Sequence, residues 1–299
     1  MCNQVEWVPQ ENGQLDLRIG LNEKEFIGDG PISIQVSHSL FDLIPSWSWF
    51  NIKGKPWTPQ SSIIGKVVES KTDDSLKGKT VFGIGKVADR IKIEPEKIIS
   101  VFDDKDEEFH LYLAQFSKLI DILKRSKISL GERTLILGAG LMGKLTSQLA
   151  FIAGSSSIEV RDIKKPKEIS SCADFKIYEE KNGQDFSDKK YDLLLDTSGN
   201  LDWINNCASG LKTGGRIVLM ADNYNQKSFD FYKCVHLKSL KLIGGSLNNS
   251  NKQVNDLEFL LHQISTGRLK APIDSVNTVK AVNIDKRVYS EGIIVDWRK

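Results

Sequence analysis

The pattern of hydrophobic and polar residues divides the chain into two parts with different periods. Before residue 105, short runs alternate between apolar and polar positions with a period near two, and turn residues separate them. Successive side chains of a strand point to opposite faces, so this period predicts half-buried strands. The runs span 32–36, 63–70, 79–84 and 90–101. We therefore expect an all-β, barrel-like domain in this part.

The second part begins with a helical period between 108 and 126, where apolar residues recur every three or four positions. From 133 onward, short apolar runs alternate with helical segments, which is typical of an α/β fold with a doubly wound parallel sheet. Strands are expected at 134–138, 157–162, 175–178, 191–196, 215–222, 240–246 and 292–297, and helices after 140 and around 201–211 and 254–267. The last strand can return to the first domain. The expected domains are 1–107 with 288–299, and 108–287.

A glycine-rich turn joins the first strand of the second part to its helix. In "TLILGAGLMGK", Gly138, Gly140 and Gly143 form the pattern G-x-G-x-x-G. The first glycine permits a tight turn, the second lets a pyrophosphate approach the backbone, and the third lets helix and strand pack closely. The N–H groups of the first helical residues, Leu141 and Met142, then face the phosphates. The motif predicts a dinucleotide site, with a purely structural turn as the alternative.

An aspartate ends the next predicted strand, 24 residues after Gly138. A carboxylate there accepts hydrogen bonds from an adenosine ribose and repels a 2′-phosphate, so Asp162 favours NAD over NADP. Three nearby cations, Arg161, Lys164 and Lys165, can offset that repulsion, and NADP stays an alternative. Later strand ends complete the expected crevice, with contacts from Thr197, Ser198, Ala221 and Ser246.

Composition narrows the class of protein. Hydrophobic residues make up 40% of the 299 and charged residues 27%, as in globular proteins, and a net charge of +2 gives no strong field for nucleic acid or membrane. The four cysteines lack C-x-x-C spacing and the spacing of a zinc site. The N-terminal segment lacks a signal-peptide pattern, and no apolar run approaches the roughly 20 residues that cross a bilayer. We expect a cytoplasmic protein that acts on a small molecule.

These motifs, in this order, resemble the medium-chain dehydrogenase/reductase superfamily over most of the chain. "IIGKVVES" and "LKGKTVFGIGK" are similar to its GroES-like domain. "GERTLILGAGLMGK" is similar to the cofactor turn of its Rossmann domain, in the form found in alcohol dehydrogenases. "YDLLLDTSGN" is similar to a later strand of that domain. The resemblance implies a two-domain, NAD(P)-dependent oxidoreductase. In size and loop the chain is also similar to the bacteriochlorophyllide-dehydrogenase-like branch.

The chain departs from the zinc-dependent members of this family at the metal ligands. Ser39 stands where those members carry a cysteine, and Ser61 and Ser62 stand where they carry histidine and glutamate. Hydroxyl groups thus replace the thiolate and imidazole that zinc prefers, and the four-cysteine lobe of the structural zinc is absent too. A zinc-independent member is expected.

Without a metal, side chains must move the proton and stabilise the alkoxide in hydride transfer. Because an ordinary histidine side chain titrates near neutral pH, His38 is the predicted proton carrier, with Ser39 as a donor or relay. A structural hydrogen-bonded pair is the alternative for both. Asp42 completes the predicted catalytic set, although capping of a following helix is equally consistent with its position.

Three aromatic residues, Trp47, Trp49 and Phe50, crowd the next segment, which edges the substrate cleft in the family. Aromatic walls suit a flat or apolar substrate, whereas core packing of a small β-domain is the alternative. The sequence thus predicts hydride transfer between NAD(H) and an alcohol or ketone of a small or medium-sized organic molecule, with biosynthesis as one setting. Reduction of an activated carbon–carbon double bond, or dinucleotide binding without catalysis, stays open. Members of the family often dimerise by pairing the last strand of this sheet, and the apolar run 240–246 offers such an edge strand, so the resemblance implies a homodimer.

Overall fold

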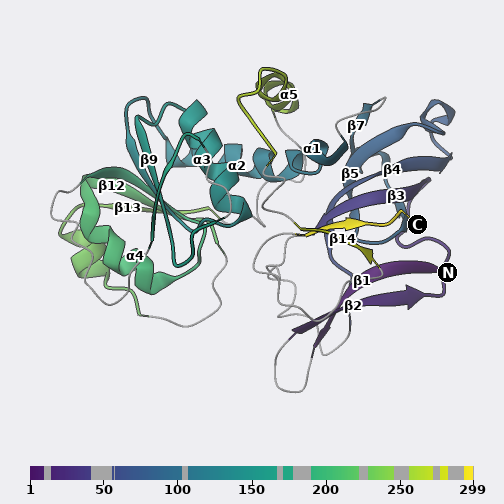
Figure 1. Cartoon of the computed structure of the whole chain (residues 1–299), viewed down its shortest axis with the longest axis horizontal. Helices are drawn as coiled ribbons and strands as arrows, with labels where there is room; N and C mark the ends of the chain where they lie inside the picture. Colours follow the sequence, from purple (N-terminus) through teal and green to yellow (C-terminus); the bar gives the residue numbers. More distant parts are fainter. Residues whose placement is uncertain are drawn as a thin grey trace. The chain divides into compact units, whose positions relative to one another are not determined.

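The computed structural model describes the chain except for residues 10–14, 42–55, 57, 103–106, 167–170, 178–189, 222–227, 246–255, 272–276, 282–292 and 299. The chain packs into two units, Met1–Ala114 with Val276–Lys299, and Gln115–Ser275 (Figure 1). The sequence placed the return to the first unit at 288. Strand β14 (Asn277–Lys280) pairs with β15 (Ile293–Asp296), so the described chain is back in the first unit by residue 277.

The first unit is built from β-strands. Its 7-stranded sheet has the order β14-β15-β3-β4-β5-β7, and β6 pairs with β3 beside this path. The pairs are antiparallel apart from β14 with β15, and β1 and β2 form a separate antiparallel hairpin. The remaining strands are β1 (Cys2–Pro9), β2 (Leu15–Asn22), β3 (Ile32–Phe41), β4 (Gln60–Ser70), β5 (Thr80–Lys86), β6 (Arg90–Ile93) and β7 (Ile98–Phe102). The predicted run 90–101 is divided between β6 and β7 by a short 3₁₀ turn at Pro95–Lys97.

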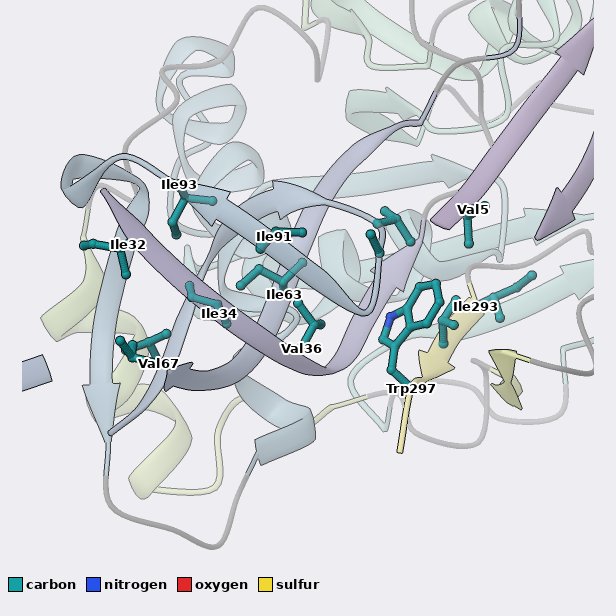
Figure 2. Packing of buried hydrophobic residues seen from close by; sticks show 14 residues of the cluster. Val5, Ile32, Ile34, Val36, Ile63, Val67, Ile91, Ile93, Ile293 and Trp297 are labelled. Atoms are coloured by element: carbon teal, nitrogen blue, oxygen red, sulfur yellow. The ribbon is translucent and has the colours of Figure 1, made fainter. Parts of the chain in front are cut away.

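Alternate residues of these strands form the core of the first unit. In β3, Ile32, Ile34 and Val36 are buried at every second position and join aliphatic residues of β4, β6 and β15 (Figure 2). Trp297, directly after β15, lies with its indole ring among these side chains. Burying each such side chain stabilises the fold by about 1.5–3 kcal/mol, which explains why the period-two pattern predicts this sheet.

The second unit holds a 6-stranded parallel sheet with the order β10-β9-β8-β11-β12-β13. This is the strand order 3-2-1-4-5-6 of a doubly wound Rossmann sheet. The strands are β8 (Arg133–Leu137), β9 (Ser157–Asp162), β10 (Asp174–Ile177), β11 (Tyr191–Asp196), β12 (Leu211–Leu219) and β13 (Lys241–Gly244). The helices are α2 (Leu113–Ser126), α3 (Leu141–Ile152), α4 (Leu201–Cys207) and α5 (Leu257–Ser265). The short helix α1 (Glu107–His110) precedes α2 and belongs to the first unit. The helix predicted over 108–126 is interrupted at Leu111–Tyr112. None of the helices that the structure describes combines the length and apolar character needed to cross a membrane.

The strand order identifies the place on this sheet where a ligand is expected to bind. The chain moves from β8 to β9 on one side and returns to β11 on the other, so the order reverses between β8 and β11. Helix α3 packs on β8 and β9, and α4 covers the opposite face, where its Trp203 and Cys207 join Leu135 (Figure 1). Ligands of open α/β sheets bind outside the carboxyl ends of the strands at such a reversal.

Candidate cofactor-binding site

The glycine turn predicted from the sequence lies at this reversal, between β8 and α3. Gly138 has a φ of +100°, a conformation that side chains strongly disfavour, and a Cβ there would lie 2.6 Å from Thr197 Oγ1. A Cβ on Gly143 would overlap the carbonyl oxygen of Gly138. Both glycines are therefore required by close packing of the turn against β11 and α3.

Gly140 is different, because no heavy atom lies within 4 Å of the position that its Cβ would occupy. Its φ of −70° is open to any residue, so neither strain nor packing requires glycine. Gly140 is the N-cap of α3 and has no side chain with which to cap the first turn. The first N–H groups of a helix have no partner within the helix, so those of Leu141, Met142 and Gly143 can serve a bound anion.

Asp162 ends β9 beside this turn, as predicted. Its Oδ2 accepts a hydrogen bond of 2.7 Å from the backbone N–H of Ala139, which fixes the carboxylate next to the glycine turn. Its Oδ1 lies 3.4 Å from the backbone nitrogen of Lys164. The carboxylate keeps further lone pairs with which it can accept hydrogen bonds from a ribose.

The side chain of Arg161, the residue before Asp162, is held by Glu159 instead. Its Nε donates to Glu159 Oε1 at 2.5 Å, and the arginine side chain is buried. Burial would raise the pKa of Glu159, but hydrogen bonds from Lys176, Tyr191 and Arg161 hold it below its usual value. The ionised glutamate keeps Arg161 inside the fold, so this cation is not placed to neutralise a phosphate at Asp162.

The ends of β11 and β12 lie on the other side of the glycine turn. Thr197 Oγ1 donates to the carbonyl oxygen of Leu137 at 2.8 Å, which holds the predicted contact residue against β8. Ser198 and Ala221 are held by Asp196, whose side chain accepts from Ser198 and whose carbonyl oxygen accepts from the N–H of Ala221 at 3.1 Å. The structure thus brings the predicted residues of four strand ends to one edge of the second unit.

Asp196 itself is 1% exposed, and burial raises its pKa to about 6, against the opposing effect of hydrogen bonds from Ser198 and Gly199. A carboxyl group whose pKa is higher in the folded than in the unfolded state stabilises the fold below its unfolded value near 3.8. That contribution is lost as the pH rises through about 6.

We predict a pH-dependent difference between the wild type and Asp196→Asn, because the asparagine does not ionise. As the pH rises from 3.5 to 7, the free energy of unfolding of the wild type should fall by roughly 3 kcal/mol relative to the variant. Urea unfolding across this pH range measures it. A constant difference would show that Asp196 does not titrate in this window.

The predicted catalytic residues His38 and Ser39 lie in the first unit, on β3 opposite β15. Ser39 faces the core, where its Oγ accepts a hydrogen bond of 3.0 Å from the indole Nε1 of Trp297. His38 is 1% exposed; its Nδ1 lies 3.2 Å from Ser37 Oγ and its Nε2 3.9 Å from Asp296 Oδ1. Ser37 donates its hydroxyl hydrogen to the carbonyl oxygen of Ile64, so it accepts from His38 Nδ1–H.

Asp296 gives His38 a negative neighbour. Burial raises the pKa of Asp296, but hydrogen bonds from the side chain and backbone of Arg298 outweigh this and lower it. The arrangement gives both predicted catalytic residues a structural role, and their catalytic roles stay a prediction. The polar partners Asp296 and Trp297 were not predicted, since they are more than 250 positions away in the sequence. Asp296 ends strand β15 and Trp297 follows it, and this strand carries no motif.

Serine side chains stand at the positions where the resemblance described above implies zinc ligands. Ser39 is engaged by Trp297, and Ser62, on β4, also supplies a hydroxyl. Zinc in proteins is held by thiolate, imidazole or carboxylate groups. Within the described ranges, no group of three or more His, Cys, Asp or Glu side chains can hold a metal ion. Asp42, the aromatic residues Trp47, Trp49 and Phe50, and Ser246 lie outside the described residues.

Comparisons with known proteins show where this fold occurs. No protein-family model matches the chain, and no curated protein matches it by sequence. Solved structures do match: a short chain alcohol dehydrogenase of Escherichia coli in complex with NADH has 12% identity and a TM-score of 0.76, covering 99% of both chains. Galactitol-1-phosphate dehydrogenase of Escherichia coli has 12% identity and a TM-score of 0.75, over 98% of this chain and 99% of that one. 2R,3R-butanediol dehydrogenase of Bacillus subtilis has 14% identity and a TM-score of 0.69, over 100% of both chains.

These likenesses confirm the predicted fold class, a Rossmann sheet with a separate GroES-like β-domain.

Proposed function

We propose that this chain is an NAD(H)-dependent oxidoreductase of the medium-chain type, which transfers hydride between nicotinamide and an alcohol or ketone of a small organic molecule. The observation that carries the proposal is the open space at Gly140 beside the N-terminus of α3, with Asp162 at the next strand end. Helix N–H groups bind a pyrophosphate, and the aspartate accepts the ribose hydroxyls. Bound NAD would supply the hydride acceptor.

The arrangement of Asp162 and Arg161 supports NAD rather than NADP. The carboxylate of Asp162 lies beside the glycine turn, where the motif predicts the adenosine ribose, while Arg161 is engaged by Glu159. A 2′-phosphate there would be repelled by the carboxylate of Asp162, and Arg161, the nearest cation in the sequence, would not offset this repulsion. The complex of a structural neighbour with NADH agrees with this choice.

We propose further that the reaction proceeds without catalytic zinc. The donor set at Ser39 and Ser62 supports this, because neither position offers a ligand that zinc prefers. In this mechanism a side chain of the chain itself holds the proton. His38 is the candidate, since its Nδ1 lies 3.2 Å from Ser37 Oγ and its Nε2 lies 3.9 Å from Asp296 Oδ1, and imidazole is the usual proton carrier near neutral pH.

Turnover on a panel of secondary alcohols, polyols and the matching ketones tests this proposal, with nicotinamide absorbance at neutral pH as the readout. We expect turnover with NAD(H) that survives dialysis against a zinc chelator, and no stoichiometric zinc by elemental analysis. His38→Ala should lose most turnover and keep NADH affinity. Turnover that disappears with the chelator and returns with zinc would contradict the metal-free mechanism.

A second function is favoured by the burial of the predicted catalytic pair. His38 is 1% exposed and Ser39 is fully buried against Trp297, as expected for a protein that binds a dinucleotide and catalyses nothing. This function predicts NADH binding with no turnover on any alcohol, ketone or activated alkene of the panel. Loss of turnover in His38→Ala at unchanged NADH affinity would exclude it.

Assembly as a homodimer and a cytoplasmic location are proposals from the sequence. Strand β13 lies at the edge of the second sheet, and an edge strand offers unpaired backbone groups to a second copy. Phe231, Tyr232 and Leu237, just before β13, are each at least 60% exposed, which supports an apolar contact there. Light scattering measures the mass in solution, and a monomer would contradict the dimer.

A further inference from the structure

Asp196, the last residue of β11, is the centre of a hydrogen-bonded turn at the carboxyl edge of the second sheet. Its Oδ1 accepts from the backbone N–H of Ser198 at 3.0 Å and from the Ser198 hydroxyl at 2.7 Å. The N–H of Gly199 lies 3.2 Å from each carboxylate oxygen. One buried side chain therefore determines the path of the chain over residues 197–199.

The backbone of Asp196 also holds the neighbouring strand end. Its carbonyl oxygen accepts from the N–H of Met220 at 3.0 Å and from the N–H of Ala221 at 3.1 Å. Thr197, directly after Asp196, donates its own N–H to the carbonyl oxygen of Leu137 at 2.9 Å and lies against Gly138. Asp196 and Thr197 thus join the ends of β8, β11 and β12.

Strand order separates these turns from Asp162. Strand β9, which carries Asp162, lies on one side of β8, and β11 and β12 lie on the other. A dinucleotide with its pyrophosphate at Gly140 and one ribose at Asp162 extends its other half over the ends of β11 and β12. The turns that Asp196 holds therefore face that second half.

We propose that Asp196 is a positioning residue for the nicotinamide half of the bound dinucleotide, acting through Thr197, Ser198 and Ala221. This inference rests on the proposed NAD(H) binding. Asp196 is buried beneath the turn and does not touch the cofactor; it holds the backbone that does. Loss of its carboxylate should loosen the nicotinamide half of the site and leave the adenosine half intact.

The same strand offers a matched control at its other end. Asp192 lies on β11 near the amino end, where its carboxylate accepts from the N–H of Arg133 at 2.9 Å and from Lys212 Nζ at 2.8 Å. It is also an aspartate and makes a similar number of hydrogen bonds. It lies four residues before Asp196, near the amino ends of the strands, whereas the glycine turn lies at their carboxyl ends. Asp192→Ala should cost stability without any effect on the site.

The test is the ratio of two affinities, those for NADH and for AMP, which occupies the adenosine half alone. Asp196→Ala should weaken NADH binding at least tenfold and AMP binding less than about twofold, because the turn at Ser198 and Gly199 loses the hydrogen bonds that order it before the cofactor binds. Asp192→Ala should change both by less than about twofold. Asp196→Asn keeps an acceptor for Ser198 and loses one for Gly199, so its NADH affinity should fall about threefold to tenfold.

Equal losses for NADH and AMP in Asp196→Ala would overturn the inference, because a merely structural role damages both halves. Unchanged NADH affinity in Asp196→Ala would overturn it too. If Asp196→Ala does not fold, the NADH-to-AMP ratio of Asp196→Asn decides, and an unchanged ratio refutes the inference. A wild type that binds neither probe would instead refute the proposed function.

Discussion

Gly140→Ala should lower the affinity for NADH at least tenfold while the free energy of unfolding changes by less than about 1 kcal/mol. No heavy atom lies within 4 Å of the new Cβ, and the φ of −70° suits alanine, so the folded chain tolerates the methyl group. Alanine is a poorer N-cap than glycine but restricts the unfolded chain, and these small effects oppose each other. The methyl group would occupy the space that the pyrophosphate needs.

Calorimetric titration with NADH and urea unfolding measure the two quantities separately. Gly143→Ala is the contrasting variant, because its Cβ would overlap the carbonyl oxygen of Gly138 and so should lower both stability and affinity. A Gly140→Ala variant that binds NADH as the wild type does would show that the open space beside α3 is not the phosphate site.

Asp162→Asn should reduce the preference for NADH over NADPH on the order of 100-fold. Two charges about 4 Å apart near a protein surface interact by a few kcal/mol, and the substitution removes the repulsion of the 2′-phosphate. Asparagine keeps an oxygen that can accept from the Ala139 N–H, so the turn should stay intact. Dissociation constants for NADH and NADPH, measured on the wild type and the variant under identical salt conditions, give the ratio directly.

Asp174→Asn is the matched control, because Asp174 is an exposed aspartate at the amino end of the neighbouring strand β10. It should leave both dissociation constants unchanged. Equal changes for NADH and NADPH in Asp162→Asn would overturn the assignment of Asp162 to the ribose.

Much of the fold could be predicted from local patterns. The limits of β9 and β11 match the predicted runs 157–162 and 191–196. Strand β11 carries a short apolar run and is mostly buried, whereas β9 alternates between buried and partly exposed positions, and both patterns are typical of strands. The hairpin β1–β2 was missed because its inner positions include the polar residues Gln4 and Glu6. Their hydrogen bond and the contact of Glu6 with Arg18 satisfy these groups, and both depend on pairing across the hairpin.

The site was predictable where a motif sets the backbone. The glycine turn and Asp162 follow from spacing, and the structure brings them together through the Ala139 N–H. The partners of His38 and Ser39 were not predictable, because Asp296 and Trp297 reach them through the pairing of β15 with β3. The same holds for Asp196, whose motif "DTSGN" is equally typical of a plain turn.

The central claim is that the edge of the second unit around Gly140 binds NAD(H), and titration of the wild type with NADH tests it most directly. Nicotinamide fluorescence or calorimetry should show saturable binding of one NADH per chain, tighter than that of NADPH. No binding of NADH, or tighter binding of NADPH, would contradict the account.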